Sequence, residues 1–138
     1  MDLTLTFRLG EELYGLEVAD VQEIVEAPDF DYIPLAPAGY LGAINFHGTI
    51  LPVLDLAGYL GLEASQRDRR VIVLPAATCP LGLGVTAVGR ILALEREKML
   101  PYLQDREREA YIREVFNHQG DMINMLDLAR LLASLETH

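Results

Sequence analysis

The sequence contains an internal repeat, and this repeat constrains the fold more than any other feature. Residues 45–48 read Asn-Phe-His-Gly, and residues 54–57 read Leu-Asp-Leu-Ala. The same pattern recurs 72 residues later, as Asn-His-Gln-Gly at 117–120 and Leu-Asp-Leu-Ala at 126–129. Two copies are too few for a solenoid, so the repeat predicts two similar units that pack against each other.

A second segment repeats in the same order and with nearly the same offset. Residues 15–21 read Gly-Leu-Glu-Val-Ala-Asp-Val, and residues 82–88 read Gly-Leu-Gly-Val-Thr-Ala-Val. Together the two repeats predict a single domain over residues 1–138 with approximate subdomains 1–64 and 65–138. We expect elements to exchange across this boundary and a groove to lie between the two units.

Length, hydrophobicity and charge narrow the class of protein further. A chain of 138 residues, 51% of them hydrophobic, fits one globular domain. Each half is too short to bury a sufficient core alone, so we expect the halves to share one. The net charge of −10 argues against nucleic acid and anionic membrane surfaces as partners. Residues 32–54 carry no acidic or basic side chain besides His47, but prolines and glycines interrupt them, so no membrane insertion is predicted.

Short segments of alternating hydrophobicity, separated by turn residues, predict a mainly β fold. We expect three hairpins, formed by residues 3–9 with 13–18, 41–46 with 49–56, and 111–116 with 121–128. Two further strands are expected at 70–74 and 81–85, and a strand or short helix at 88–94. Helices are expected at 20–27, 57–62 and 129–135, and a helix or loop at 95–109. Short strands at this spacing favour small barrels.

Catalytic and cofactor-binding patterns have better structural explanations in this chain. Asp55 and Asp127 are equivalent in the repeat, but each precedes an apolar helical stretch, where a carboxylate caps the helix. Residues 82–87 match a dinucleotide-binding fingerprint, yet no helix of adequate length follows them. Cys79, the single cysteine, has no predicted base beside it and is expected to be a spectator thiol. We therefore predict no enzymatic activity, no cofactor and no metal site.

Four segments together carry a recognisable family pattern. They are residues 7–16, 21–24, 42–56 and 82–88. Residues 42–56 are similar to the pattern G-x-x-N-x-R-G-x-x-x-P-x-x-D-L. In these segments the chain resembles the CheW-like chemotaxis coupling proteins. The resemblance is collinear from about Leu3 to Leu132, which is essentially the whole chain.

The resemblance implies both a fold and a function. The implied fold is mainly β, with two similar five-stranded SH3-like β-barrel subdomains packed together with a few short helices. The implied function is that of a cytoplasmic, non-enzymatic adaptor recruited to membrane receptor arrays. Its partners would be the cytoplasmic tip of methyl-accepting chemotaxis receptors and the regulatory domain of a CheA-type histidine kinase. The alternative is a divergent CheW-like module that serves a non-chemotaxis kinase pathway, such as one for pili or gliding.

The resemblance also assigns candidate receptor- and kinase-binding residues, namely Val21, Glu23, His47 and Val88. Val21 and Val88 match apolar positions that contact the receptor, although both could instead be plain core valines. His47 replaces an arginine that faces the glutamate matched by Glu23, so the ion pair would need a protonated imidazole. A neutral turn histidine is the alternative. Thr86 replaces an aspartate of the family pattern and removes a surface charge.

Overall fold

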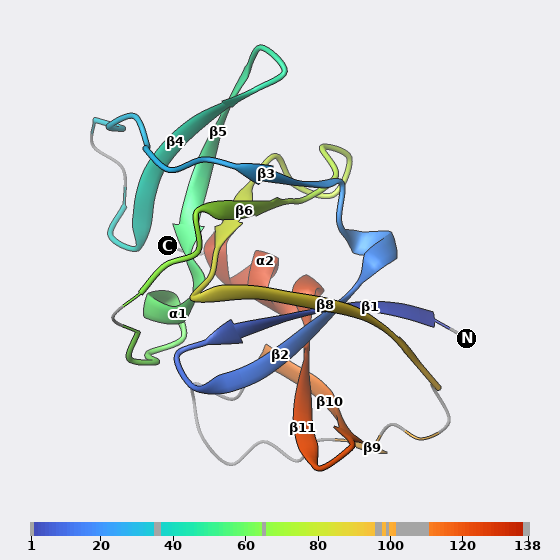
Figure 1. Ribbon diagram of the computed structural model, residues 1–138. Coiled ribbons are helices and arrows are strands. Elements are labelled where there is room, and N and C mark those ends of the chain that lie inside the picture. Colours follow the sequence, from blue (N-terminus) through green and yellow to red (C-terminus); the bar gives the residue numbers. More distant parts are fainter. Residues whose placement is uncertain are drawn as a thin grey trace.

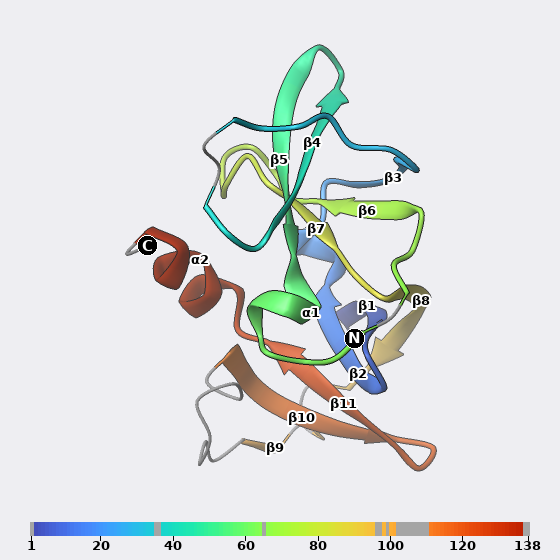
Figure 2. The ribbon, with the colours of Figure 1, turned by 90° about the vertical axis from the view of Figure 1, so that its left-hand side faces the viewer.

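The computed structural model describes residues 2–34, 37–64, 66–95, 98, 100–101 and 111–136. Eleven strands, arranged as two sheets, make up most of this described part (Figure 1). Three short helices accompany them: η1 (Val18–Asp20), α1 (Leu56–Tyr59) and α2 (Leu128–Glu136). Figure 2 shows α2 at one side of the molecule, between the levels of the two sheets. Within the described ranges, no helix is both long and apolar enough to cross a membrane.

The two sheets differ by one strand. The six-stranded sheet has the order β8 (Ala87–Leu94), β1 (Asp2–Leu9), β2 (Glu12–Glu17), β11 (Asp121–Leu126), β10 (Ile112–His118) and β9 (Leu100–Pro101). The five-stranded sheet has the order β3 (Glu23–Glu26), β6 (Arg70–Val73), β7 (Gly82–Gly84), β5 (Thr49–Asp55) and β4 (Tyr40–Phe46). The mainly β fold with two similar units is therefore confirmed. Among the described residues, no ladder joins the first strand of either sheet to its last, so closure into a barrel is not seen.

The two copies of the repeat interleave. Strand β5 pairs in parallel with β7, which places Val53 opposite Gly82. The equivalent ladder joins β11 to β2 and places Met125 opposite Gly15. Each hairpin thus pairs with the glycine-containing strand of the other copy, and both sheets contain strands from both halves of the chain. The approximate boundary between residues 64 and 65 stays a prediction.

The repeated Asn-x-x-Gly pattern forms the same turn twice. Residues 47–48 have φ angles of 50° and 84°, and residues 119–120 have φ angles of 52° and 89°. Two successive positive φ angles define the hairpin turn whose twist matches the flanking strands, and glycine adopts the second position without strain. The side-chain oxygens of Asn45 and Asn117 accept hydrogen bonds from the second turn residue, at 2.9 and 3.1 Å. The repeat therefore reflects a local requirement of each hairpin.

The repeated aspartates cap the helices that follow them, as predicted. Asp55 accepts a hydrogen bond from the backbone N–H of Gly58 at 3.3 Å. Asp127 accepts one from the backbone N–H of Arg130 at 3.2 Å. Each carboxylate satisfies a donor at a helix N-terminus that has no partner within the helix.

One large hydrophobic cluster lies between the two sheets and is built from both halves of the chain. It includes Phe7 and Leu16 from the first half and Ile72 and Leu83 from the second. Two smaller clusters lie within the individual sheets; one of them contains Val53 of the five-stranded sheet. The expectation of a shared core is confirmed.

The helix predicted for residues 20–27 is wrong. After η1 the chain forms strand β3, which pairs antiparallel with β6. Ile24 packs against the large cluster and Val25 against a smaller one, so successive side chains are covered on opposite faces, as a strand requires. Residues 88–94, for which a strand or a short helix was expected, form a strand. The helix or loop predicted for 95–109 lies mostly outside the described residues, and Leu100–Pro101 within this range form strand β9 instead.

The parallel ladder beside Gly82 leaves no room for a side chain. A Cβ atom there would lie 2.8 Å from Cγ1 of Val71 and 3.4 Å from Cγ2 of Val53. We expect Gly82→Ala to lower the free energy of unfolding by about 1–3 kcal/mol, because overpacking a dense core strains it. Urea denaturation measures this loss. In the double variant with Val71→Ala the loss should be smaller than the sum of the single losses, and simple additivity would contradict the proposed clash.

Candidate protein-interaction site

His47 and Glu23 meet at one end of the five-stranded sheet. His47 lies in the turn of the β4–β5 hairpin, which projects beyond β3 at the top of Figure 1. Its Nε2 atom is 3.3 Å from Oε1 of Glu23, the first residue of β3, and the side chains are 72% and 45% exposed. The His47 ring also meets the Phe46 ring edge-on, with 4.3 Å between centroids. The structure thus brings together the two residues that the family pattern pairs.

Val21 and Val88 lie in different elements of the fold. Val21 joins η1 to β3, and Val88 lies in β8 opposite Phe7 of β1. Both valines are half-buried and pack against the large cluster. Each therefore contributes to the core while leaving part of its surface accessible to a partner.

A bulge in β8 extends an apolar surface beside Val88. Leu5 lies opposite Ile91 and Phe7 opposite Val88, so three steps along β8 match two along β1. Because of this extra residue, Val88 and Ile91 face the same side of the sheet. The hydroxyl of Thr6 donates to the carbonyl of Arg90 within the bulge, at 2.7 Å.

Leu3 continues this face at the far end of β1. The side chains of Leu3 and Ile91 are 52% and 55% exposed, although both are large and apolar. We call Leu3, Val88 and Ile91 the β1–β8 apolar strip. Such a strip on a strand pair at the edge of a sheet is a surface that a partner protein can cover.

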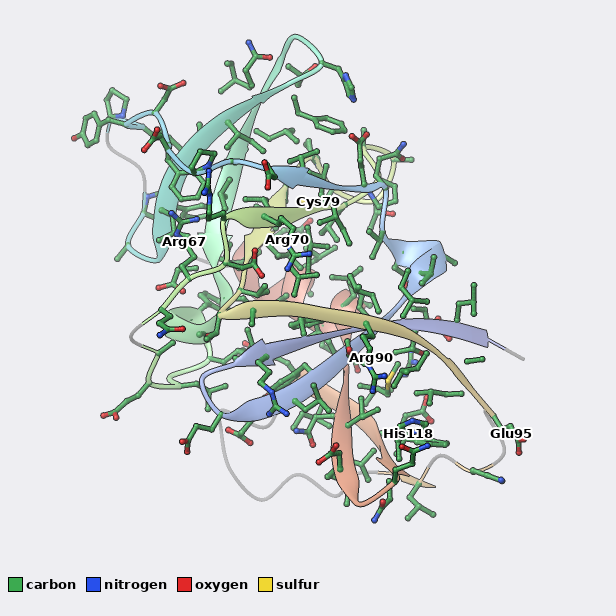
Figure 3. The ribbon with its side chains drawn as sticks, in the orientation of Figure 1. Arg67, Arg70, Cys79, Arg90, Glu95 and His118 are labelled. Atoms are coloured by element: carbon green, nitrogen blue, oxygen red, sulfur yellow. The ribbon has the colours of Figure 1, made fainter. Side chains whose placement is uncertain are left out.

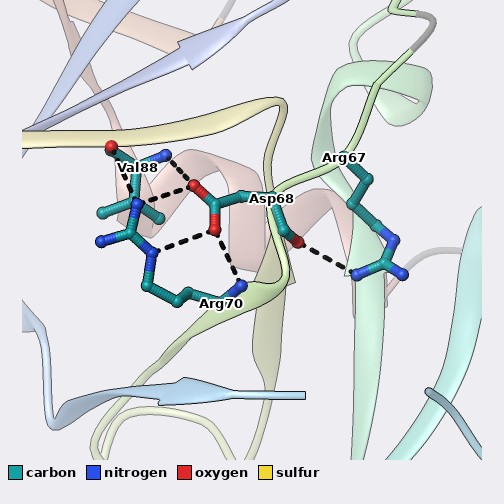
Figure 4. Close-up of polar contacts among 4 residues, drawn as sticks. All are labelled: Arg67, Asp68, Arg70 and Val88. Atoms are coloured by element: carbon teal, nitrogen blue, oxygen red, sulfur yellow. Dashed lines mark hydrogen bonds and ion pairs between the residues drawn. The ribbon is translucent and has the colours of Figure 1, made fainter. Parts of the chain in front are cut away.

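Asp68 lies in the link of residues 63–70 between the two halves of the chain and joins the two sheets, although it was not singled out from the sequence. Its carboxylate accepts hydrogen bonds from Nε and Nη2 of Arg70, both at 3.0 Å, and from the Arg70 backbone N–H at 2.8 Å. It also accepts one from the backbone N–H of Val88 at 2.7 Å (Figure 4). Arg70 belongs to β6 and Val88 to β8, and Figure 3 shows Arg70 between these strands. An aspartate among three arginines was the only signal in the sequence.

The surroundings of Asp68 stabilise its charged form. Burial alone would raise the pKa of this carboxyl, but hydrogen bonds from Arg70 and Val88, together with the charge of Arg70, lower the pKa to about 2. The Asp68 side chain is only 11% exposed, so solvent screens these contacts less than it screens the His47–Glu23 pair.

Thr86 retains one function that an aspartate at this position would have. Its hydroxyl oxygen accepts a hydrogen bond from the backbone N–H of Gly10 at 2.8 Å, and its own N–H donates to the carbonyl of Arg8 at 3.0 Å. These bonds fix the turn between β1 and β2 to the start of β8. The replacement therefore removes the charge and preserves an acceptor for the turn.

The apparent nucleotide-binding fingerprint and Cys79, both considered in the sequence analysis, have structural explanations. Residues 82–84 of the apparent dinucleotide fingerprint form β7 inside the five-stranded sheet. Cys79 is half-buried, and burial, with a contribution from Glu136, raises the pKa of its thiol, which leaves it a weak nucleophile. In the part of the chain that the structure describes, no three side chains of His, Cys, Asp or Glu gather as metal ligands.

The chain thus combines two interleaved sheets with an exposed His47–Glu23 pair and the β1–β8 apolar strip. The chain matches the family model described as CheW-like domain over residues 3–136 and belongs to this family. It is 31% identical to chemotaxis protein CheW of Rhizobium meliloti over 137 residues, which cover 96% of this chain and 88% of the relative.

Two further proteins are similar over different shares of the chain. The crystal structure of scaffolding protein TtCheW from Thermoanaerobacter tengcongensis aligns with a TM-score of 0.81 and 28% identity, and covers 91% of this chain and 88% of that one. Protein PilI of Pseudomonas aeruginosa is 32% identical over 84 residues, which cover 59% of this chain and 47% of the relative. The match to the TtCheW structure shows that this chain shares the fold of the family as well as its sequence pattern.

We expect Asp68→Asn to lower the free energy of unfolding at pH 7 by about 2 kcal/mol, because the charged carboxylate is the form that Arg70 and Val88 stabilise. A lowered pKa contributes stability that is fully present above the ordinary value of 3.8 and is lost as the pH falls toward about 2. The difference between the two proteins should therefore shrink over this acidic range. Guanidinium denaturation at several pH values measures it.

Glu63→Gln is the matched control, because it removes one negative charge from an exposed position in the same link. It should leave stability within about 0.5 kcal/mol of the wild type. An Asp68→Asn variant that behaves like this control at every pH would show that the network does not stabilise the fold.

Proposed function

We propose that this protein is a cytoplasmic, non-enzymatic adaptor that couples methyl-accepting chemotaxis receptors to the regulatory domain of a CheA-type histidine kinase. The observation that carries this proposal is the match to the CheW-like domain over residues 3–136, together with the fold shared with a scaffolding protein. The names of the relatives, chemotaxis protein CheW among them, support a role in chemotaxis signalling.

The receptor contact is assigned to the β1–β8 apolar strip together with Val21. A helical hairpin that docks against a protein surface needs a few apolar anchors, and this strip offers exposed and half-buried ones side by side. The Asp68 network holds the backbone of Val88 in place beside β6. The surface is thus apolar and fixed in position, which lowers the entropic cost of binding.

The kinase contact is assigned to the two-unit fold as a whole and not to a set of individual side chains. Two similar β units in one chain can meet a related two-unit domain through small, pseudo-symmetric contacts. Interfaces of modest area correspond to affinities near the micromolar range. The His47–Glu23 pair, at the exposed end of the five-stranded sheet, is the candidate polar element for coupling the partners.

A CheW-like module outside chemotaxis is the second candidate function. Two observations favour it: the similarity to Protein PilI, and histidine instead of arginine at position 47. Co-purification from the source organism distinguishes the candidates, since a chemotaxis kinase with its receptors supports the first and a kinase of another pathway supports the second.

We expect Val88→Lys and Val21→Lys to abolish binding of the receptor tip while leaving binding of the kinase regulatory domain unchanged. Lysine can extend from a half-buried position into solvent, so the fold should survive while the apolar contact is lost. Sedimentation with each partner and circular dichroism of each variant measure these outcomes. Ile50→Lys, a change of the same kind at an exposed position in β5, is the control and should bind both partners.

Two outcomes would contradict this expectation. Unfolding of both valine variants would identify these side chains as core residues. A wild-type protein that binds neither partner at roughly 100 μM would reject the adaptor function.

We expect His47→Arg to bind these partners more tightly than the wild type near pH 8 and with a weaker pH dependence. Histidine changes its charge between about pH 5 and 8, whereas arginine stays charged and can pair with Glu23 throughout. Titration calorimetry at about pH 6 and 8 measures the difference. Gln119→Arg, at the equivalent turn position with nearly the same φ, is the control and should not change binding. Parallel pH profiles of wild type and His47→Arg would show that this pair does not control affinity.

A further inference from the structure

A groove of about 450 Å³ opens on the five-stranded sheet between its two outermost strands, β3 and β4. One wall is formed by β3 and the segment after it, and the other by residues 43–47. We call it the β3–β4 groove. Its volume lies within the range of about 300–1,000 Å³ that is common for binding sites.

The β4 side of the groove presents backbone hydrogen-bonding groups. At one end, Ala43 exchanges two hydrogen bonds with Asp31, at 2.8 and 2.9 Å, on the side of β4 that faces away from β5. Ala43 lies opposite Pro52, which has no N–H to offer. Because alternate residues of a strand direct their N–H and C=O groups to the same side, Asn45 directs its backbone groups into the groove.

The β3 side presents the same kind of edge. The backbone N–H of Ala27 donates to the carbonyl of Arg69 at 2.7 Å, which directs alternate residues of β3 toward β6. Ile24 and Glu26 therefore direct their backbone groups away from β6 and toward the groove. Consistent with this alternation, the N–H of Arg70, opposite Glu26, donates to Asp68 and not to β3.

The groove has an apolar floor and an acidic rim. Val25, Ile44 and Phe46 line it and belong to the smaller hydrophobic cluster of this sheet. Its acidic lining residues are Glu23, Glu26, Asp29 and Asp31. His47 is the one residue among those lining the groove that can carry a positive charge. Outside the lining, Arg67 stacks on the Phe30 ring at 4.3 Å and donates to the carbonyl of Pro28.

In the other sheet, the equivalent edge carries a short strand at the position that matches Ala43. In the repeat, β10 corresponds to β4, and β9 pairs with β10 at Val115 and Glu114. The equivalent edge of β4 carries the isolated bridge from Asp31. Beyond this bridge, toward His47, the groove provides the space and the backbone groups for a longer strand.

We propose that the β3–β4 groove binds an extended, basic segment of a partner protein, which pairs as a strand with β4 beyond Ala43. Alternate apolar side chains of the segment contact the floor, and the lysine or arginine side chains between them reach the acidic rim. This inference goes beyond the adaptor function, because the groove lies apart from the β1–β8 apolar strip, shares only Glu23 and His47 with the candidate coupling element, and binds a partner segment defined by its own chemistry.

The test uses the full-length protein and a synthetic peptide of alternating lysine and valine, about eight residues long, which is about the length of a strand. We expect saturable binding in an NMR titration, with slowed amide exchange at Asn45 of β4 and chemical-shift changes at Ile24 and Glu26 across the groove. Glu26→Lys combined with Asp29→Lys should weaken binding at least about tenfold, because like charges then face each other. Glu26→Gln combined with Asp29→Asn should give a smaller loss and keeps the test valid if charge reversal disturbs the fold.

Two controls separate strand pairing from general attraction to an acidic protein. Glu11→Lys with Asp121→Lys makes the same change in net charge at exposed positions outside the groove and should bind the peptide as the wild type does. A peptide with an N-methyl group on every residue lacks the backbone N–H donors that strand pairing requires on either edge, and it should not bind.

The proposal is overturned by equal weakening in both charge-reversed proteins, by undiminished binding of the N-methylated peptide, or by shifts centred on the β1–β8 apolar strip. It is also overturned if the unmodified peptide does not bind at roughly 1 mM. Because the adaptor function is tested with receptor and kinase fragments, its failure and the failure of this inference are distinguishable.

Discussion

The carboxylate of Asp68 is the polar contact on which the relative position of the two sheets depends. It accepts hydrogen bonds from Arg70 in one sheet and from the backbone of Val88 in the other. Hydrophobic packing between the sheets is strong but not directional, so it does not define a register by itself. A charge-assisted set of hydrogen bonds is directional. It fixes β8, which carries part of the apolar strip, relative to β6, which pairs with β3 at the groove. Both proposed surfaces therefore depend on the same side chain.

The interleaved repeat explains why this small protein has one core between two units. Each sheet takes its central glycine-containing strand from the other half of the chain, so neither half holds all the strands of a sheet. Gly15 lies close to Met125 and Ile123, and Gly82 lies close to Val53, so a side chain at either position would press against the other copy of the repeat. The glycines in the repeat thus mark the places where the two copies meet, in the same way as Asn45 and Asn117 mark the hairpin turns.

The sequence alone predicted those features that depend on residues close together in the chain. The hairpins at residues 47–48 and 119–120 and the capping by Asp55 and Asp127 were predictable, because each depends on side chains within a few residues. Strand β3 was mistaken for a helix because its partner β6 lies more than 40 residues further along the chain. The Asp68 network was not predictable from composition, since Val88 contributes only backbone atoms. The proximity of His47 and Glu23 came from family resemblance, not from any spacing rule.

The order in which the strands pair has a consequence for biosynthesis. Strand β2 lies beside β11, with Tyr14 opposite Asn124, so two central strands of one sheet are separated by nearly the whole chain. Such distant pairing gives a high contact order and slow folding. A ribosome releases the chain from its N-terminus, so β1 and β2 emerge first as a hairpin, which is at best marginally stable alone. The six-stranded sheet can be completed only after residues 121–126 have been synthesised, and until then the face of the first hairpin that packs against β11 remains exposed to chaperones and to other nascent chains.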